Sequence, residues 1–139
     1  MAIAASAATP DFTEEAHHQV YAKEIVPFAK KLGLSKKRLC ELLGFPRSTV
    51  DRQIAANRLL SPDHAERFLG VWELAELVAQ MVNESGNPEG FDAAAWLGDW
   101  LRRPQPALGG IPPADYLYTQ GGIGIVRDLL LRAQSGAYT

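Results

Sequence analysis

The chain has 139 residues, of which 47% are hydrophobic, and its formal net charge is −2. This length fits one domain or two small ones that share a core, and the apolar content is enough to bury a real interior. No apolar run approaches the length of a membrane span, and the first ten residues carry neither a basic leader nor a continuous apolar segment, so we expect a cytoplasmic protein.

The charge is distributed unevenly along the chain. Residues 30–58 hold eight lysines and arginines against two acidic residues, a local charge of +6, whereas residues 1–29 carry −3 and residues 59–139 carry −5. A basic block within a helical pattern is typical of a surface that faces phosphate, and an acidic region suits a protein partner. We therefore expect two different binding surfaces in the two parts of the chain.

The first predicted helix follows a disordered start. Residues 1–12 are mostly small and show no helical pattern, so we expect them to be disordered. Thr13 can cap a helix that stops near Ile25. Pro27 opposes a continuous helix, so the chain either kinks there or starts a second helix, which Gly33 ends.

The basic segment contains two short helices separated by a glycine. A small residue of the first helix, Cys40, lies four positions before Gly44, which allows the two helices to approach and the chain to reverse through a left-handed turn. The second helix covers residues 47–57, where Val50 and Ile54 form an apolar pair at i and i+4. This arrangement predicts a helix-turn-helix.

Serine caps are predicted for two helices. Ser35 caps the first helix of the helix-turn-helix, and Ser61 with Pro62 begins a much longer helix that runs to about Asn83. Apolar residues recur at the helical period throughout this long helix, and we expect it to join the two parts of the chain. The residues of this stripe are Ala65, Phe68, Leu69, Trp72, Ala75, Val78, Ala79 and Val82.

A tryptophan-containing helix follows a loop that is rich in glycine, asparagine and proline. Asp92 or the residue before it opens this helix, and both of its tryptophans fall on one stripe at the helical period. We therefore expect Trp96 and Trp100 to lie mostly in the core. The positions of the stripe are Ala93, Trp96, Leu97, Trp100 and Leu101.

A rigid loop and a final helix complete the chain. Pro104 ends the tryptophan helix, Gly109 and Gly110 permit backbone angles closed to other residues, and Pro113 begins a new short helix. The final helix covers roughly residues 120–135 and stops at Gly136. Its expected buried residues are Ile123, Val126, Leu129, Leu130 and Ala133.

The order of these C-terminal motifs resembles one known domain. The pattern is a Trp-Leu helix, Pro-x-x-Ala-Leu-Gly-Gly over residues 104–110, a proline-led short helix that ends at Thr119, a Gly-Gly pair, and a Val-x-x-Leu-Leu helix that closes at Gly136. It resembles the C-terminal toxin-binding domain of the Xre/MbcA/ParS antitoxins, whose N-terminal part is an Xre-like helix-turn-helix domain. The resemblance covers roughly residues 28–139.

This resemblance implies an antitoxin of a type II toxin-antitoxin system. The implied partner is a RES-domain toxin that consumes NAD or uses it for ADP-ribosylation, and the implied inhibition covers the cleft where NAD enters. The resemblance also implies repression of the antitoxin's own operon. A homodimer and a higher complex with the toxin are expected, because a single helix-turn-helix reads only half of a two-fold operator.

The exposed start of the second short helix carries side chains suited to DNA. Arginine can fork onto guanine, glutamine can pair with adenine, and serine or threonine can hold phosphate. An ordinary solvated helix face is the alternative. The candidate DNA-binding residues are Lys36, Lys37, Arg38, Arg47, Ser48, Thr49, Arg52 and Gln53.

A toxin-binding surface is expected in the C-terminal part. We expect contact from the loop between Pro104 and Pro113 and from the tail after residue 136, where Tyr138 or the terminal carboxylate can reach the NAD cleft. A frayed terminus is the alternative for the tail, and core packing is the alternative for the tyrosines beside the loop. The candidate toxin-binding residues are Leu108, Gly109, Gly110, Tyr116, Tyr118, Gly136, Ala137, Tyr138 and Thr139.

No catalytic site, metal or cofactor is expected. His17, His18 and His64 have no metal-ligand spacing, and Cys40 has no evident base or second thiol. The glycines of residues 121–124 do not follow a predicted strand and lack the third glycine of a nucleotide loop. We expect the chain to act by binding.

The predicted fold class is all-α. An N-terminal helix-turn-helix domain at residues 13–60 is joined through the long helix to a C-terminal helical toxin-binding domain at residues 61–139. Two other functions fit the same pattern. One is a stand-alone transcriptional regulator with a C-terminal dimerisation or ligand domain, and the other is an adaptor that does not bind DNA.

Overall fold

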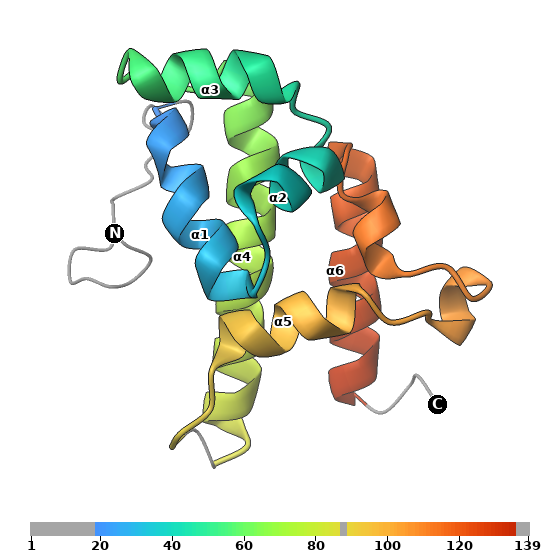
Figure 1. Cartoon of the computed structure of the whole chain (residues 1–139). Coiled ribbons are helices and arrows are strands. Elements are labelled where there is room, and N and C mark those ends of the chain that lie inside the picture. The colour runs from blue at the N-terminus through green and yellow to red at the C-terminus, as the bar shows by residue number, and fades with distance from the viewer. Residues whose placement is uncertain (1–18, 87–88, 136–139) are drawn as a thin grey trace.

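The computed structural model describes residues 19–86 and 89–135 (Figure 1). Within these residues the chain forms α-helices and short 3-10 helices, and its only strand-like pairings are two isolated β-bridges. The expected all-α class is therefore confirmed. The elements are η2 (Ala22–Glu24), α1 (Ile25–Leu32), α2 (Lys36–Leu43), α3 (Arg47–Ala55), α4 (Pro62–Glu84), α5 (Ala93–Leu101), η3 (Pro106–Leu108), η4 (Pro113–Tyr116) and α6 (Gln120–Ser135).

The predicted helix ends are confirmed in the helix-turn-helix region. The Ser35 hydroxyl accepts a hydrogen bond from the backbone N–H of Arg38 at 3.0 Å, and α2 begins at the next residue. Gly33 and Gly44 end α1 and α2 with φ angles of 78° and 77°, in the left-handed region that glycine adopts without strain. Local chemistry therefore sets where these helices stop.

The two helices after the helix-turn-helix also begin at side-chain caps. The Ser61 hydroxyl accepts from the N–H of His64 at 3.3 Å, and Pro62 is the first residue of α4. An Asp92 carboxylate oxygen accepts from the N–H of Ala95 at 3.0 Å at the start of α5. Of the two predicted starts of the tryptophan helix, the structure selects Asp92 as the cap.

The first helix differs from the sequence-based prediction. Its expected cap, Thr13, lies outside the described residues, and residues 19–21 belong to no helix. The Ala22 N–H donates to the Arg58 carbonyl at 2.9 Å, and the Leu60 N–H donates to the Val20 carbonyl at 2.7 Å. These hydrogen bonds pair the segment with the chain after α3, so it forms a β-bridge instead of a helix.

Pro27 lies in the first turn of α1. It is the third residue of α1, which follows η2 without a gap. The N–H groups in the first turn of a helix have no partners within that helix. Proline, which lacks an N–H group, therefore removes no intrahelical hydrogen bond there. Whether the chain kinks or restarts after the helix expected from Thr13 stays a prediction, because residues 13–18 lie outside the described ranges.

Helix α4 runs through the centre of the molecule and contacts α2, α5 and α6 (Figure 1). Phe28 of α1 packs against Phe68 and Trp72 of α4, with ring centroids 5.1 and 6.1 Å apart. The buried face is wider than the predicted stripe, because Val71 and Leu74 are also buried. The stripe prediction fails at Ala79, which is exposed although Val78 before it is buried and Val82 after it is half-buried.

The orientation of α5 corrects the prediction for one tryptophan. Trp100 is 8% exposed, as expected for the core, but Trp96 is 36% exposed and stacks on Trp100 with ring centroids 6.0 Å apart. Gly98 faces α1 instead, and a Cβ there would lie 1.8 Å from the Leu32 carbonyl oxygen. This close approach centres the buried face on Gly98 and leaves Trp96 at its edge.

The loop after α5 has the constrained geometry that its sequence predicts. Gly109 and Gly110 adopt φ angles of 69° and 85°. The Gly110 N–H donates to the Gln105 carbonyl at 2.9 Å, and Gln105 forms an antiparallel bridge with Ile111. Gln105 is itself buried, and its amide donates to the Arg103 carbonyl at 3.3 Å. Backbone pairing across its base therefore closes the loop.

Helix α6 begins at Gln120, as predicted, and packs on α4. The Thr119 hydroxyl accepts from the Gly122 N–H at 2.9 Å, and a Cβ at Gly122 would lie 1.9 Å from the Tyr116 carbonyl oxygen. The prediction that Ala133 is buried is wrong, because this residue is exposed beyond the covered part of α6. Four of the expected positions are buried, namely Ile123, Val126, Leu129 and Leu130.

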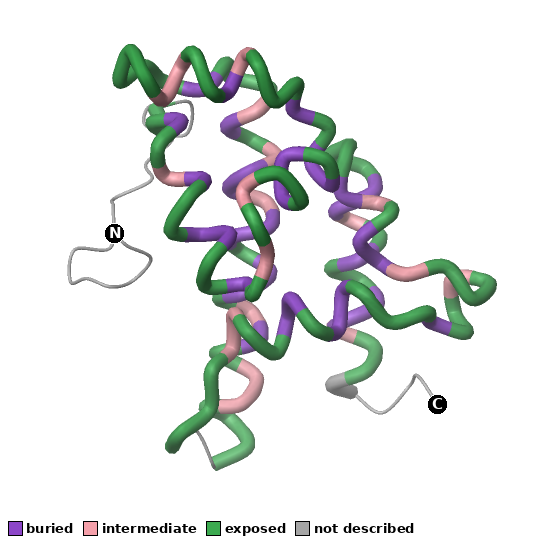
Figure 2. The backbone as a smooth tube through the Cα atoms, in the orientation of Figure 1, coloured by how far each residue is buried: buried purple, intermediate pink, exposed green. Residues whose placement is uncertain are grey.

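One hydrophobic core runs through both parts of the chain. It includes residues of α1 and α2 as well as residues of α5 and α6, and α1 packs directly on α5. Figure 2 shows buried positions on all of these helices, whereas the outer side of α3 is exposed. No helix in the described ranges is long and apolar enough to cross a membrane.

Candidate functional site

Helix α3 lies across one end of the molecule with a long exposed side (Figure 1). Val50 is completely buried beneath it and Ile54 is partly buried, so these two residues attach the helix to the core. The Phe45 N–H donates to the Cys40 carbonyl at 2.9 Å and closes the turn from α2. The helix-turn-helix geometry thus presents the outer face of α3 to solvent.

The candidate DNA-binding residues of α3 divide into two groups. Ser48 and Arg52 are exposed and lie one turn apart on the side opposite Val50, and Arg47 is exposed at the start of the helix. Thr49 is half-buried. Gln53 is also half-buried, and its Oε1 is enclosed without a hydrogen-bond partner among the described residues. Of the five candidate residues on α3, the two arginines and the serine are therefore the exposed ones.

Two ion pairs alter the expected basic surface of α2. Lys36 Nζ lies 2.6 Å from Asp51 Oδ1 of α3, and Arg38 pairs with Glu41 at 3.2 Å. The hydrogen bond from Lys36 holds the pKa of the Asp51 carboxyl below its ordinary value. Lys37 is exposed on the same helix. Two of the three basic side chains expected to meet phosphate are thus paired with carboxylates.

Helix α4 holds the turn of the helix-turn-helix through Arg67. Its Nε donates to the Leu43 carbonyl at 2.9 Å, and its Nη1 lies 2.7 Å from Asp63 Oδ2. The guanidinium group also lies over the Phe45 ring, 5.4 Å from its centroid. Because Leu43 is the last residue of α2, the arginine places positive charge at the negative end of that helix.

His64 stacks on the Phe45 ring, with centroids 4.1 Å apart. Its Nδ1 is buried without a hydrogen-bond partner in the described part of the chain. Burial lowers the pKa of His64, the charge of Arg67 lowers it further, and Asp63 opposes both effects. The lowered pKa favours the neutral imidazole, which packs on the Phe45 ring beside the turn.

An exposed apolar surface surrounds a hollow in the C-terminal part of the chain. Ile111, Tyr118 and Ile125 are all exposed, although they come from the loop, the segment after η4 and the outer side of α6. They line an open hollow of about 440 Å³. The other lining residues are Asp115, Tyr116, Thr119 and Gly122. Large exposed apolar residues that gather in this way are typical of a contact site for another protein.

This C-terminal surface adjoins the helix-turn-helix. A Cβ at Gly44 would lie 3.3 Å from the Cβ of Tyr118, so the turn between α2 and α3 packs against the segment that carries the tyrosine. The tyrosine is nevertheless 59% exposed. The two candidate surfaces therefore meet at Gly44 and Tyr118.

Comparison with known protein families matches both parts of the chain. Residues 12–71 match the model of the antitoxin Xre-like helix-turn-helix domain, and residues 89–136 match that of the antitoxin Xre/MbcA/ParS C-terminal toxin-binding domain. A relative from Sphingobium sp. (strain YBL2), named Prs ADP-ribosylating antitoxin, is 40% identical over 119 residues, which cover 86% of this chain and 75% of the relative. The chain belongs to the Xre/MbcA/ParS family of antitoxins. The predicted family is thus confirmed.

The structure places the predicted toxin-binding residues that it describes in two regions of the antitoxin. Gly109 and Gly110 are exposed in the loop, next to the partly buried Leu108. Tyr116, which is partly buried, and the exposed Tyr118 line the hollow. The last four predicted residues lie outside the described ranges, namely Gly136, Ala137, Tyr138 and Thr139.

Two apolar residues of the hollow were not among the predicted toxin-binding residues. Ile125 lies on the outer side of α6, and Ile111 follows the glycine pair of the loop. The signal for Ile125 was present, because it falls off the buried stripe of the antitoxin's final helix. The position of Ile111 follows from the bridge to Gln105, which cannot be read from helical periodicity.

No metal site is evident in the described part of the antitoxin. Among residues 19–86 and 89–135, no group of three or more histidine, cysteine, aspartate or glutamate side chains is placed to hold a metal ion. Cys40 is buried in the core.

Proposed function

We propose that this antitoxin inhibits a RES-domain toxin that consumes NAD or uses it for ADP-ribosylation, by covering the cleft where NAD enters. The observation that carries the proposal is the 40% identity to an antitoxin whose name refers to ADP-ribosylation of Prs. The antitoxin acts by binding, in the cytoplasm, and has no catalytic role of its own. Its toxin-binding domain spans residues 61–139, and its helix-turn-helix domain spans residues 13–60.

The apolar hollow supports a toxin contact on the C-terminal part. Ile111, Tyr118 and Ile125 are large, exposed and adjacent, and aromatic or aliphatic anchors of this kind contribute most of the binding energy at many interfaces. The loop residues 108–110 and Tyr116 extend the same contact. A cleft that binds the phosphates of NAD is positively charged, and residues 59–139 carry −5. The tail at residues 136–139 completes the proposed surface.

The toxin contact can be tested by expressing the toxin encoded beside the antitoxin gene together with antitoxin variants. We expect Ile125→Asp to weaken inhibition about tenfold or more, because it places a charge in the apolar contact. Val26→Asp is the matched control, since Val26 is 47% exposed on α1 and Ile125 is 44% exposed on α6. Growth, cellular NAD and copurification of the toxin are measured at equal antitoxin abundance.

The outcomes distinguish the proposed surface from the alternatives. Normal protection and copurification with Ile125→Asp and Ile111→Asp would exclude the hollow as the toxin contact. Loss of protection after deletion of residues 137–139 alone would assign the inhibition to the tail. If the wild-type protein neither copurifies with the toxin nor restores NAD, the stand-alone regulator becomes the better explanation.

Repression of its own operon is the second proposed function of the antitoxin. The exposed face of α3, with Arg47, Ser48 and Arg52, supports it, and Lys37 lies on the preceding helix. A homodimer is proposed because two such helices are needed for a two-fold operator. Binding of a duplex from the upstream region, measured over a series of salt concentrations, tests this function.

A further inference from the structure

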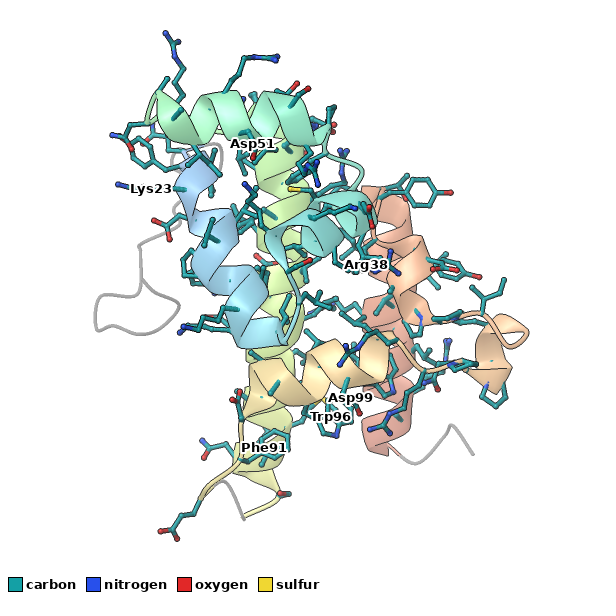
Figure 3. The ribbon with its side chains drawn as sticks, in the orientation of Figure 1. Lys23, Arg38, Asp51, Phe91, Trp96 and Asp99 are labelled. Carbon is teal, nitrogen blue, oxygen red and sulfur yellow. The ribbon has the colours of Figure 1, made fainter. Side chains whose placement is uncertain are left out.

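An acidic side chain stands on the helix that we propose to face DNA. Asp51 is exposed on α3 (Figure 3). In the sequence it follows Arg47 by four positions, about one helical turn, and directly precedes Arg52. Its Oδ1 accepts a hydrogen bond from Lys36 Nζ of α2 at 2.6 Å. No residue in the described ranges donates to Oδ2, which therefore remains available as an acceptor.

A carboxylate has a restricted role at a DNA surface. It repels phosphate, and on the base edges of the major groove it can accept a hydrogen bond only from an amino group, most favourably from cytosine N4. The same carboxylate pairs with the Lys36 ammonium group and therefore competes with phosphate for it. The requirement for an amino group weakens binding to an unmatched sequence more than binding to a matched one, whereas the pairing of Lys36 weakens binding to both sequences alike.

We propose that Asp51 is a specificity-determining residue of the DNA binding proposed above, which selects a cytosine through its free carboxylate oxygen and withholds Lys36 from non-specific phosphate contacts. This inference rests on the proposed operon repression. A carboxylate at this position lowers total affinity and raises the ratio between matched and unmatched sequences.

A purely structural role explains Asp51 less well. The pair with Lys36 is exposed to solvent, and exposed ion pairs contribute little to stability. Helices α2 and α3 also contact each other apart from this exposed pair, because Leu39 and Leu43 of α2 and Val50 of α3 are buried in the same hydrophobic core.

The second ion pair of this region provides a matched control. Glu41 pairs with Arg38 at 3.2 Å, but both residues lie on α2. Glu41→Gln releases a basic side chain, as Asp51→Asn does, without removing an acceptor from α3. Glu41→Gln therefore shows the effect of releasing a cation alone. Asp51→Asn shows that effect together with the loss of base selection.

The experiment measures fluorescence anisotropy of two labelled duplexes, one from the region upstream of the gene and one of scrambled sequence. For Asp51→Asn we expect several-fold tighter binding to the scrambled duplex, a salt slope steeper by about one ion, and a roughly tenfold smaller ratio between the two affinities. Glu41→Gln should strengthen binding to both duplexes alike. Adding Lys36→Gln to Asp51→Asn should remove the extra salt dependence.

A cytosine scan locates the selected base. Each C·G pair of the upstream duplex is replaced by T·A, and one replacement should weaken wild-type binding roughly tenfold while changing Asp51→Asn binding less than about twofold. An unchanged affinity ratio in Asp51→Asn, or equal losses for both duplexes together with a lower melting temperature, would overturn the specificity role. If the wild-type protein binds neither duplex, the proposed DNA binding fails and the role of Asp51 fails with it.

Discussion

Gly98 of α5 lies directly against the carbonyl oxygen of Leu32 in α1, so closely that a Cβ on the glycine would be 1.8 Å from that oxygen. Leu32 is the last residue of α1, and Gly98 is in the middle of α5. The contact joins the helix-turn-helix part of the antitoxin to its C-terminal part through backbone atoms. Neither helix can accommodate a larger residue there without moving.

Gly98→Ala is expected to destabilise the protein. The new methyl group forces α5 away from α1, and overpacking of this kind costs about 1–3 kcal/mol of the free energy of unfolding. Gly124→Ala in α6 is the control, because a Cβ at Gly124 meets no atom within 4 Å. That change should be neutral or stabilising by up to about 1 kcal/mol. Urea denaturation of both variants checks the prediction, which an unaltered stability of Gly98→Ala would contradict.

Arg67→Gln is expected to loosen the turn between α2 and α3. The side chain is only 11% exposed and donates to the Leu43 carbonyl, so its loss should lower the free energy of unfolding by about 1.5–3 kcal/mol. Arg103→Gln is the control, because Arg103 forms an exposed pair with Asp99 and should cost less than about 1 kcal/mol. Equal melting temperatures for the two variants would show that the Arg67 contacts do not stabilise the turn.

His64 should make the antitoxin less stable in acid. Its pKa in the folded state is lowered by burial, so the unfolded chain binds the proton more readily. The stability that the neutral imidazole contributes is present above the ordinary histidine pKa of about 6.5 and is lost as the pH falls through the folded-state value. The free energy of unfolding, measured by denaturation at several pH values between 7.5 and 5, should therefore fall more steeply with decreasing pH for the wild type than for His64→Gln. Both proteins retain His17 and His18, so parallel curves would exclude His64 as the source.

Arg52 should contribute directly to operator binding. It is exposed near the middle of the outer face of α3, so Arg52→Ala is expected to cost about 1–3 kcal/mol of binding free energy if the side chain reads a base. Adding Arg47→Ala should weaken binding further. Arg127→Ala removes the same charge from the exposed side of α6 and should leave affinity nearly unchanged. Anisotropy titrations with the upstream duplex measure these affinities. An unchanged affinity of the double variant would show that α3 does not contact the DNA.

Local chemistry explains why so much of the secondary structure could be predicted. A serine hydroxyl at Ser35 caps the helix that begins one residue later, and Gly44 adopts the left-handed angle that ends it. The glycine pair at residues 109–110 and the proline before η4 act in the same local way. These signals depend on neighbours within a few positions, so no tertiary contact is needed to read them.

The candidate DNA surface was only partly predictable. Arg47, Ser48 and Arg52 are exposed as expected, because Val50 and Ile54 define the opposite side of α3. The pairing of Lys36 with Asp51 was not predicted, since the two residues are fifteen positions apart and meet only through the fold of the turn. Composition counts both charges but does not show which charges neutralise each other.

By itself the sequence determined the all-α class, the ends of most helices, the helix-turn-helix and the antitoxin family. Only the tertiary structure decided that residues 19–21 pair with the chain after α3, that Trp96 lies at the edge of the core, and that Ile111 and Ile125 share a hollow with Tyr118. The physical reason is that helical periodicity shows which residues share an apolar stripe, but not which of them lie deepest in the core and which lie at its edge. Which residues lie deepest depends on close packing between segments distant in the chain, such as Gly98 on Leu32.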